Sequence, residues 1–315
     1  MRIVLLGNVD LPYSSETYYV KTLRSMGHDV LALQEGVVPA EHILQQALGS
    51  DLFVWIHGHS DETPGTSMEV VLRVLKFNGV ITLTWHHDLF FGLGRQNLIT
   101  ESPVYKYVDH FFSTDKLMAD WVNEHTHVRG HYLPSAVYDK EAIMLPQKNL
   151  APEIVFVGNK GYHPEWQYRP NLIKWLEEKY IGRFGWYSGE ENSLGLKRGL
   201  EMNQLFADTK IVVGDTLCMN FNYPYYWSDR LWETLGRGGF LIMPYVKGMK
   251  KYVTDGTHLR FYEFGNFKQL KYMIDYYLKN DDEREKIRKA GHEYVKKNHT
   301  YVHRWKEILR EINKD

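Results

Sequence analysis

Short apolar runs alternate with helix-like stretches along most of this chain, and this alternation constrains the fold more than any other feature. A strand that is apolar throughout is typical of a parallel sheet covered on both faces, and a helix between successive strands supplies the crossover. The predicted strands are residues 2–6, 30–33, 52–56, 80–84, 110–113 and 130–133, then 154–157, 184–187, 211–213, 240–243 and 260–262.

The strand pattern stops after Pro134 and restarts near residue 154, which divides the chain into two halves. We therefore predict an α/β protein with two Rossmann-like, doubly wound domains at residues 1–136 and 153–315. The segment 137–152 contains Pro146 and Pro152 and is interpreted as a linker. Three amphipathic helices are expected at the end, the first with Asn266 and Gln269 spaced as a capping box.

The composition excludes several classes of protein. A net charge of −1 gives no general attraction to nucleic acid or to an anionic membrane. The single cysteine, Cys218, allows no internal disulfide and fits a reducing compartment. The apolar start of the chain is too short for a signal peptide, and no stretch is long enough to span a membrane. A cytoplasmic protein is expected.

Polar residues gather in the loops that follow the predicted strands of the first half. His57 and His59 follow the third strand, and His86, His87 and Asp88 follow the fourth. Because parallel strands end at one edge of a sheet, these side chains are expected to lie near one another. They fit a metal site, a general base for a hydroxyl acceptor, or simple polar caps. Asp88, His87 and then His59 are the candidates for catalysis.

The stretch 228–245 combines a charged and an apolar helix face with a following buried strand. Ser228 is a plausible N-cap, and Arg230, Glu233 and Arg237 share one side of the helix. Such a face can hold a ribose through its carboxylate and a diphosphate through its arginines. The same spacing is also typical of a solvated face of ion pairs, so both interpretations stay open.

Other candidate ligand contacts lie elsewhere in the second half. Gly158, Asn159 and Lys160 form a glycine-containing loop at a strand end, a fair phosphate site that matches no P-loop. Arg169 begins the next helix, and the aromatic loop before Ser228 contains Tyr225. A loop that leads into a helix is where a ligand's sugar would be expected in a doubly wound domain.

From about residue 154 onward the sequence resembles the GT-B glycosyltransferases, in particular the CgeB-like, spore-maturation-type branch of the group 1 enzymes. The resemblance is carried by Phe156-Val157-Gly158 with Arg169, by Arg230-Leu231-Trp232-Glu233 before Gly238-Gly239-Phe240, and by Asp255-Gly256. It extends to the ending Asn298-His299-Thr300-Tyr301 with Arg304 and, more loosely, to 85–88 and 111–115.

The resemblance implies two domains that face a central cleft, with the acceptor on the N-terminal domain and the final helix packed back on it. It implies a donor ribose held by Glu233, a donor diphosphate held by Arg230 and Arg169, and no catalytic metal. Where the family often has an earlier glutamate, this chain has Tyr225. Retention or inversion at the sugar therefore stays open.

The function expected from these observations is transfer of a sugar from a nucleotide-diphosphate sugar, such as UDP-glucose, to a hydroxyl acceptor. No permanently bound cofactor is expected. The acceptor is a glycan, a small molecule or a hydroxymethylated base in DNA, as for phage glucosyltransferases. A nucleotide-sugar epimerase or hydrolase is the second alternative, and a sensor that binds the nucleotide without turnover is the third. The sequence does not define the oligomeric state.

Overall fold

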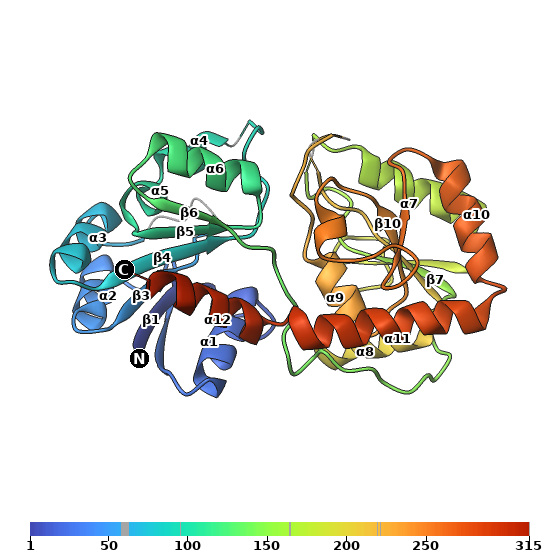
Figure 1. The fold of residues 1–315 in the computed structure, drawn as a ribbon, viewed down its shortest axis with the longest axis horizontal. Helices are drawn as coiled ribbons and strands as arrows, with labels where there is room; N and C mark the ends of the chain where they lie inside the picture. Colours follow the sequence, from blue (N-terminus) through green and yellow to red (C-terminus); the bar gives the residue numbers. More distant parts are fainter. Residues whose placement is uncertain (58–62, 95, 164, 219, 221, 315) are drawn as a thin grey trace. The chain divides into compact units, whose positions relative to one another are not determined.

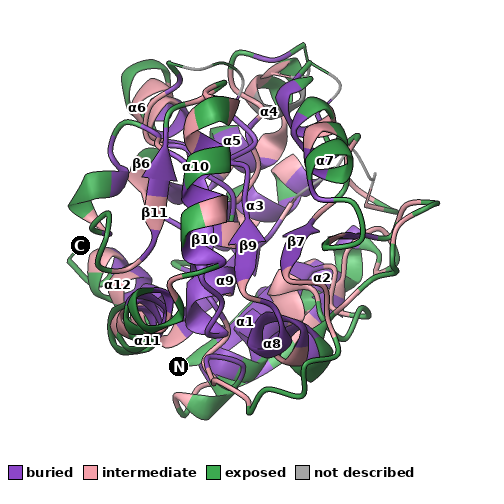
Figure 2. Cartoon of the chain, turned by 90° about the vertical axis from the view of Figure 1, so that its right-hand side faces the viewer, coloured by how far each residue is buried: buried purple, intermediate pink, exposed green. Residues whose placement is uncertain are grey.

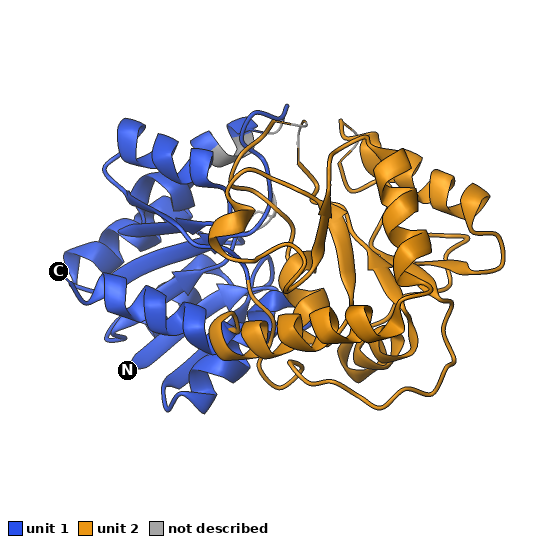
Figure 3. Cartoon of the chain, turned by 45° about the vertical axis from the view of Figure 1, so that its right-hand side comes forward, with its two compact units in different colours: residues 1–135, 301–315 blue, residues 136–300 orange. Residues whose placement is uncertain are grey.

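A computed structural model describes residues 1–57, 63–94, 96–163, 165–218, 220 and 222–314. The chain divides into two compact units, drawn in blue and orange in Figure 3. Unit 1 comprises Met1–Ser135 and Tyr301–Asp315, and unit 2 comprises Ala136–Thr300. In the described residues, no helix has the length and apolar character needed to cross a bilayer. His59 lies outside the described residues.

Unit 1 is built on a parallel sheet with the order β2-β1-β3-β4-β5-β6. Every predicted strand of this half is present, with ends shifted by at most two residues. The strands are β1 (Arg2–Gly7), β2 (Asp29–Gln34), β3 (Leu52–Trp55), β4 (Ile81–His86), β5 (His110–Ser113) and β6 (Arg129–Tyr132).

Helices connect these strands and cover the sheet (Figure 1). They are α1 (Ser15–Ser25), α2 (Ala40–Ala47), α3 (Met68–Phe77), α4 (Gln96–Glu101), α5 (Pro103–Tyr107) and α6 (Lys116–His125). The side chain of Ser14 caps α1 by accepting from the amide of Thr17, and Asp115 caps α6 by accepting from Leu117. The polar residues before these helices therefore define where the helices begin.

One boundary in unit 1 differs from the prediction in a way that affects function. Trp85 and His86 belong to β4 and are not loop residues. They pair with Phe112 and Ser113 of β5, and both side chains are buried. The predicted strand ended at residue 84. Because β4 is covered on both faces, its buried residues continue to the end of the strand and include Trp85 and His86. The loop of β4 therefore begins at His87.

The last helix of the chain, α12 (Tyr301–Ile312), belongs to unit 1 and lies beside α1 (Figure 1). The ring of Tyr301 meets the ring of Tyr19 edge to face, with centroids 4.9 Å apart. Nε of Arg304 donates to the carbonyl of Pro134 at 2.7 Å. Aromatic packing and a buried arginine thus attach the end of the chain to the N-terminal sheet.

Unit 2 contains a second parallel sheet with the order β11-β10-β9-β7-β8. Its strands are β7 (Ile154–Val157), β8 (Phe184–Tyr187), β9 (Ile211–Val213), β10 (Leu241–Pro244) and β11 (Arg260–Tyr262). Its helices are α7 (Tyr168–Lys179), α8 (Gly199–Asp208), α9 (Arg230–Gly236), the 3₁₀ turn η1 (Met249–Lys251), α10 (Phe267–Tyr277) and α11 (Asp281–Asn298).

The strands of unit 2 form a buried centre, coloured purple in Figure 2, between helices with exposed outer faces. Asn266 caps α10 by accepting from the amide of Gln269 at 2.9 Å, so the predicted cap is confirmed. The prediction of two parallel α/β sheets with a helical ending is likewise confirmed. Residues 136–152 are part of unit 2, where Asn203 of α8 donates to the carbonyls of Glu141 and Ile143.

The strand order of each sheet changes direction at one place. In unit 1 this switch point lies between β1 and β3, and in unit 2 it lies between β7 and β9. Helices on either side of a switch point diverge, which leaves room for a ligand outside the carboxyl ends of the strands. The loops after these four strands are therefore the first places to look for a site.

Candidate functional site

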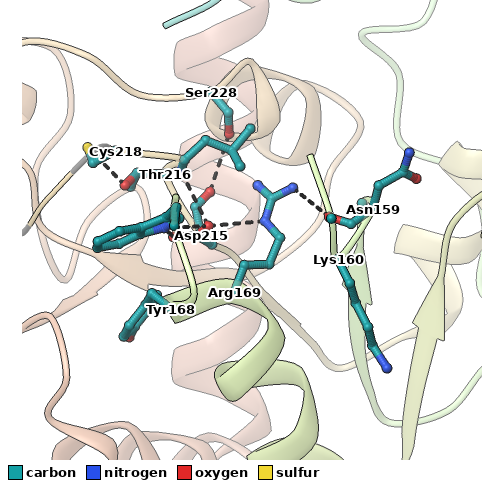
Figure 4. Close-up of polar contacts among 12 residues, drawn as sticks. Asn159, Lys160, Tyr168, Arg169, Asp215, Thr216, Cys218 and Ser228 are labelled. Carbon is teal, nitrogen blue, oxygen red and sulfur yellow. Dashed lines mark hydrogen bonds and ion pairs between the residues drawn. The ribbon is translucent and has the colours of Figure 1, made fainter. Parts of the chain in front are cut away.

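At the switch point of unit 2, a buried aspartate orients an arginine (Figure 4). Asp215 follows β9, and its Oδ2 lies 3.0 Å from Nε of Arg169 on the first turn of α7. Trp166 Nε1 reaches both carboxylate oxygens of Asp215 at 3.3 Å. The carboxylate is fully buried and the arginine side chain is 7% exposed. A buried charge pair of this kind survives only because further hydrogen bonds complete it.

The loop after β7 approaches the same arginine from the other side. Nη1 of Arg169 donates to the carbonyl of Asn159 at 3.0 Å, as Figure 4 shows. Gly158 has a φ of 142°, a conformation that side-chain-bearing residues rarely adopt. A Cβ at Gly158 would lie 3.3 Å from Nη1 of Arg169, so a glycine allows the loop to come this close. The structure thus places Gly158, Asn159 and Arg169 in one cluster.

Lys160 belongs to this loop but its ammonium group is directed away from Arg169 (Figure 4). Nζ lies 3.9 Å from the centre of the Trp186 ring and 3.4 Å from Oε1 of Glu177. The backbone amide of Lys160 donates to Oε2 of Glu190 at 2.8 Å. In this structure the lysine therefore serves a cation–π contact and a surface ion pair, while the arginine occupies the switch point.

Arg230 lies close to the Arg169 cluster without a carboxylate bound to its guanidinium among the described residues. It is half-buried at the start of α9, and within the described residues it forms no ion pair. Among the residues that the structure describes, the one hydrogen-bond partner of its Nη1 is the Sδ of Met202, at 3.9 Å. Burial lowers the pKa of Arg230, and the positive charges of Arg169 and Arg198 lower it further. Asp229 and Glu233 raise that pKa, so an anion beside Arg230 would be favourable.

Glu233 is paired with the buried Arg237. Its Oε2 accepts from Nε of Arg237 at 2.8 Å, and Glu233 itself is 12% exposed. The Arg237 guanidinium also contacts Oε2 of Glu141, the side chain of Asn203 at 2.6 Å and the carbonyl of Gly199 at 3.0 Å. Oε1 of Glu233 has no hydrogen-bond partner within the described part of the chain. Arg237 thus fixes one carboxylate oxygen of Glu233 and makes no bond to the other.

The predicted N-cap at Ser228 is wrong by one residue. The residue before the first turn of α9 is Asp229, and it makes no side-chain capping bond. Ser228 instead donates its hydroxyl hydrogen to the carbonyl of Asp215 at 3.3 Å. This bond joins the two ends of the single loop between β9 and α9, and it outweighs the local preference of serine for an N-cap.

Tyr225 lies in the loop before α9 with a φ of 53°, the left-handed region. Its amide donates to the carbonyl of Lys247 at 2.9 Å, and Nζ of Lys251 lies 5.0 Å from its ring centre. A Cβ at Gly248 would collide with the Tyr225 ring. The tyrosine is thus packed against the loop after β10 in a strained conformation, and such strain concentrates at functional sites.

In unit 1, His87 is held tightly by aromatic neighbours. Its Nε2 forms a hydrogen bond with the hydroxyl of Tyr19, and its ring lies 4.4 Å from the Trp85 ring. Burial lowers the pKa of His87 to about 3, although the adjacent Asp88 opposes this shift. The imidazole is therefore neutral, with one nitrogen already engaged. Asp88 is half-buried next to it. No three described His, Cys, Asp or Glu residues are grouped as metal ligands.

Two residues that shape the site were not singled out as site residues from the sequence. Asp215 orients Arg169 across 46 positions, and Glu141 holds Arg237 across 96 positions. Asp215 carried a usable signal, because it lies two residues after the end of a strand, at the edge where ligands bind. Glu141 carried none, since it lies in a segment interpreted as a linker.

The second half of the chain is similar to a known protein family. Residues 155–310 match the family model described as glycosyl transferase-like. Just under half of the chain is thus similar to the glycosyl transferase-like family, and the two parallel α/β sheets match the GT-B glycosyltransferase fold. The finer resemblance to the CgeB-like branch is not confirmed. No curated protein sequence matches the chain.

Several solved structures share the fold over their whole length. The HepE protein of Anabaena, solved with UDP-glucose, has a TM-score of 0.68 at 12% identity, and 100% of each chain is covered. Sucrose-phosphate synthase of Thermosynechococcus elongatus has a TM-score of 0.65 at 12% identity, again with 100% of each chain covered. An α-glucosyltransferase solved with UDP-glucose and DNA has a TM-score of 0.69 at 12% identity, with 99% of each chain covered. At such identities the likeness concerns the fold.

Proposed function

We propose that this protein transfers a hexosyl group from a UDP-sugar, such as UDP-glucose, to a hydroxyl acceptor. Unit 2 binds the donor, with its diphosphate on Arg169 and Arg230 and its ribose on Glu233. The observation that carries the proposal is Arg230, a half-buried arginine without a carboxylate partner among the described residues, beside two further arginines. A diphosphate supplies the two negative charges that this cluster lacks.

Each of the other donor contacts has a definite part in the proposal. Gly158 and Asn159 let the diphosphate approach Arg169 along the backbone, because no side chain intervenes at Gly158. Oε1 of Glu233 accepts from a ribose hydroxyl while Arg237 holds Oε2. Ser228 and Tyr225 shape the wall near the donor sugar. The UDP complexes of HepE and of the α-glucosyltransferase support the choice of uridine.

The chemistry is displacement at the anomeric carbon. The bond from that carbon to the diphosphate oxygen breaks, and its electron pair leaves with UDP. Arg169 and Arg230 stabilise the negative charge that grows on the leaving group. In unit 1, Asp88 lies beside the half-buried His87 and is proposed to contact the acceptor.

A hydroxylated base in DNA is not favoured as the acceptor, although one structural neighbour was solved with DNA. The net charge of −1 gives the chain no overall attraction to a polyanion. A glycan or a small hydroxyl compound agrees better with this charge.

The donor site is tested by thermal unfolding in the presence of UDP, ADP, GDP and CDP. A nucleotide at 100 times its Kd stabilises a protein by about 2.7 kcal/mol, and UDP is expected to give the largest rise in Tm. A Tm unchanged by all four would refute a nucleotide site. Mass spectrometry of acceptor mixtures incubated with UDP-glucose then identifies the glucosylated product.

A further inference from the structure

A carboxylate, an indole and an imidazole meet near the carboxyl end of β3 in unit 1. Nε1 of Trp55 donates to Oε1 of Glu35 at 2.6 Å, and Nδ1 of His57 lies 2.5 Å from the same oxygen. Trp55 ends β3, His57 lies two residues further on, and Glu35 directly follows β2. The side chains of His57 and Glu35 are 14% and 10% exposed, so the pair is largely shielded from water.

The carboxylate determines which nitrogen of His57 carries the proton. An ionised carboxylate only accepts hydrogen bonds, so Nδ1 donates, and the neutral ring then has its lone pair on Nε2. Within the described residues, Nε2 of His57 makes no hydrogen bond. The Trp55 ring packs against the imidazole with centroids 4.9 Å apart and fixes its orientation. This arrangement leaves one basic nitrogen available in a defined direction.

The position of this pair in the fold is that of a ligand site. Its strand, β3, borders the switch point of unit 1. The neighbouring loop after β1 is fixed by Gln34, whose Oε1 accepts from the amides of Val9 and Asp10, each at 2.9 Å. Glu16 is a second carboxyl near the pair, since burial raises its pKa and the charge of Glu35 raises it further. Several polar groups therefore converge where an acceptor would bind.

His57 differs from His87 in the way that matters for a base. Nε2 of His87 is already engaged by the hydroxyl of Tyr19. A base needs a free nitrogen to take a proton and a partner that stabilises the positive charge formed. His57 has both features.

We propose that His57 is the general base that takes the proton from the acceptor hydroxyl, and that Glu35 and Trp55 are positioning residues. The proposal rests on the proposed function. In this step the proton moves to Nε2 of His57, and the acceptor oxygen forms a bond to the anomeric carbon. The bond from that carbon to UDP breaks, and UDP leaves with the electron pair. Glu35 stabilises the positive charge of the imidazolium until His57 releases the proton to water.

The test uses UDP-glucose with water as the acceptor, so that no other acceptor has to be known. UDP release is measured for the wild type, for His57→Gln and for Glu35→Gln, together with UDP binding and Tm. His42→Gln is the matched control, because His42 is an exposed histidine of the same unit. His57→Gln is expected to lower kcat by about 10²–10⁴-fold, the usual contribution of a general base, with UDP affinity unchanged.

Further readouts separate a base from a merely structural residue. Added imidazole is expected to restore part of the activity of His57→Gly, which a structural role would not allow. Glu35→Gln is expected to lower kcat while KM for UDP-glucose stays unchanged. If His57→Gln and the wild type release UDP within twofold of each other, the base is elsewhere, for instance on the leaving phosphate. A wild type that binds UDP but releases none from UDP-glucose also contradicts the base. Failure of UDP to bind overturns the proposed function instead.

Discussion

Oδ2 of Asp215 lies 3.0 Å from Nε of Arg169, and this buried pair joins the loop after β9 to the first turn of α7. The two residues flank the switch point of the unit 2 sheet. Asp215 holds one edge of the guanidinium, and the carbonyl of Asn159 holds Nη1. The arginine is therefore pre-oriented before any ligand arrives, which lowers the entropic cost of binding an anion.

Replacing Asp215 with Asn is expected to destabilise the protein by about 3 kcal/mol, because Arg169 keeps its charge in a buried place without a counter-ion. Urea unfolding monitored by tryptophan fluorescence measures the change. Glu153→Gln is the control, since Glu153 pairs with Arg183 and Lys210 at the surface and its loss costs about 1 kcal/mol or less. Equal losses in the free energy of unfolding for the two variants would show that the buried Asp215 pair stabilises the protein no more than a surface ion pair.

Glu233→Gln is expected to weaken UDP binding by about tenfold, because a charge-assisted bond to a ribose hydroxyl is lost. Arg237 keeps Glu141 as a partner, so the protein should stay folded. Binding of 2′,3′-dideoxyuridine diphosphate provides the control, since it has no ribose hydroxyl to lose. Titration calorimetry should show a loss for UDP only, and an equal loss for both nucleotides would remove Glu233 from the ribose site.

Gly158→Ala is expected to lower both UDP affinity and stability. Its φ of 142° imposes strain of about 1–3 kcal/mol on alanine, and the new Cβ lies 3.3 Å from Nη1 of Arg169. Gly182→Ala is the matched variant, because Gly182 has a φ of 73° and open space around its Cβ position. That variant should lose stability but keep UDP affinity. Retained affinity in Gly158→Ala would show that the loop does not carry the diphosphate.

His86 makes unit 1 sensitive to acid. Burial lowers the pKa of His86 from 6.5 to about 4, so the unfolded chain binds a proton below pH 6.5 that the folded chain does not. The free energy of unfolding should therefore fall as the pH decreases from about 6.5 to 4, by about 1.4 kcal/mol per pH unit from this residue. Denaturant unfolding measures the difference in the free energy of unfolding between pH 5 and pH 7. His86→Gln should reduce this difference, whereas His42→Gln should not. An unchanged slope in His86→Gln contradicts the assignment.

The sequence predicted the sheets well because their strands are local apolar runs. All the strands predicted from residue 2 to residue 262 are present, and the capping box at Asn266 forms as expected. The ends of the elements were less certain. Trp85 and His86 extend β4 because β5 pairs with them, and the pairing partner is not visible in a single segment.

The candidate site was predicted in its residue types but not in its partnerships. The charged stripe of Arg230, Glu233 and Arg237 is present, but its members differ in their contacts. Arg230 has no ion pair among the described residues, whereas Glu233 is paired with the buried Arg237. The partners that decide these roles, Glu141 and Asp215, lie far away in sequence. Likewise, His57 is paired with Glu35 while Nε2 of His87 is engaged by Tyr19, and sequence spacing alone does not distinguish these two histidines.

The most direct test of the donor site is the affinity of UDP-glucose for Arg230→Gln, measured by titration calorimetry. Arg230 is a half-buried cation without an ion-pair partner among the described residues, so its removal should leave the Tm of the free protein unchanged or higher. Loss of its bond to the diphosphate should weaken UDP-glucose binding by at least about tenfold. Arg183→Gln, at an exposed ion pair, should bind as the wild type does. Wild-type affinity in Arg230→Gln would contradict a diphosphate site in unit 2.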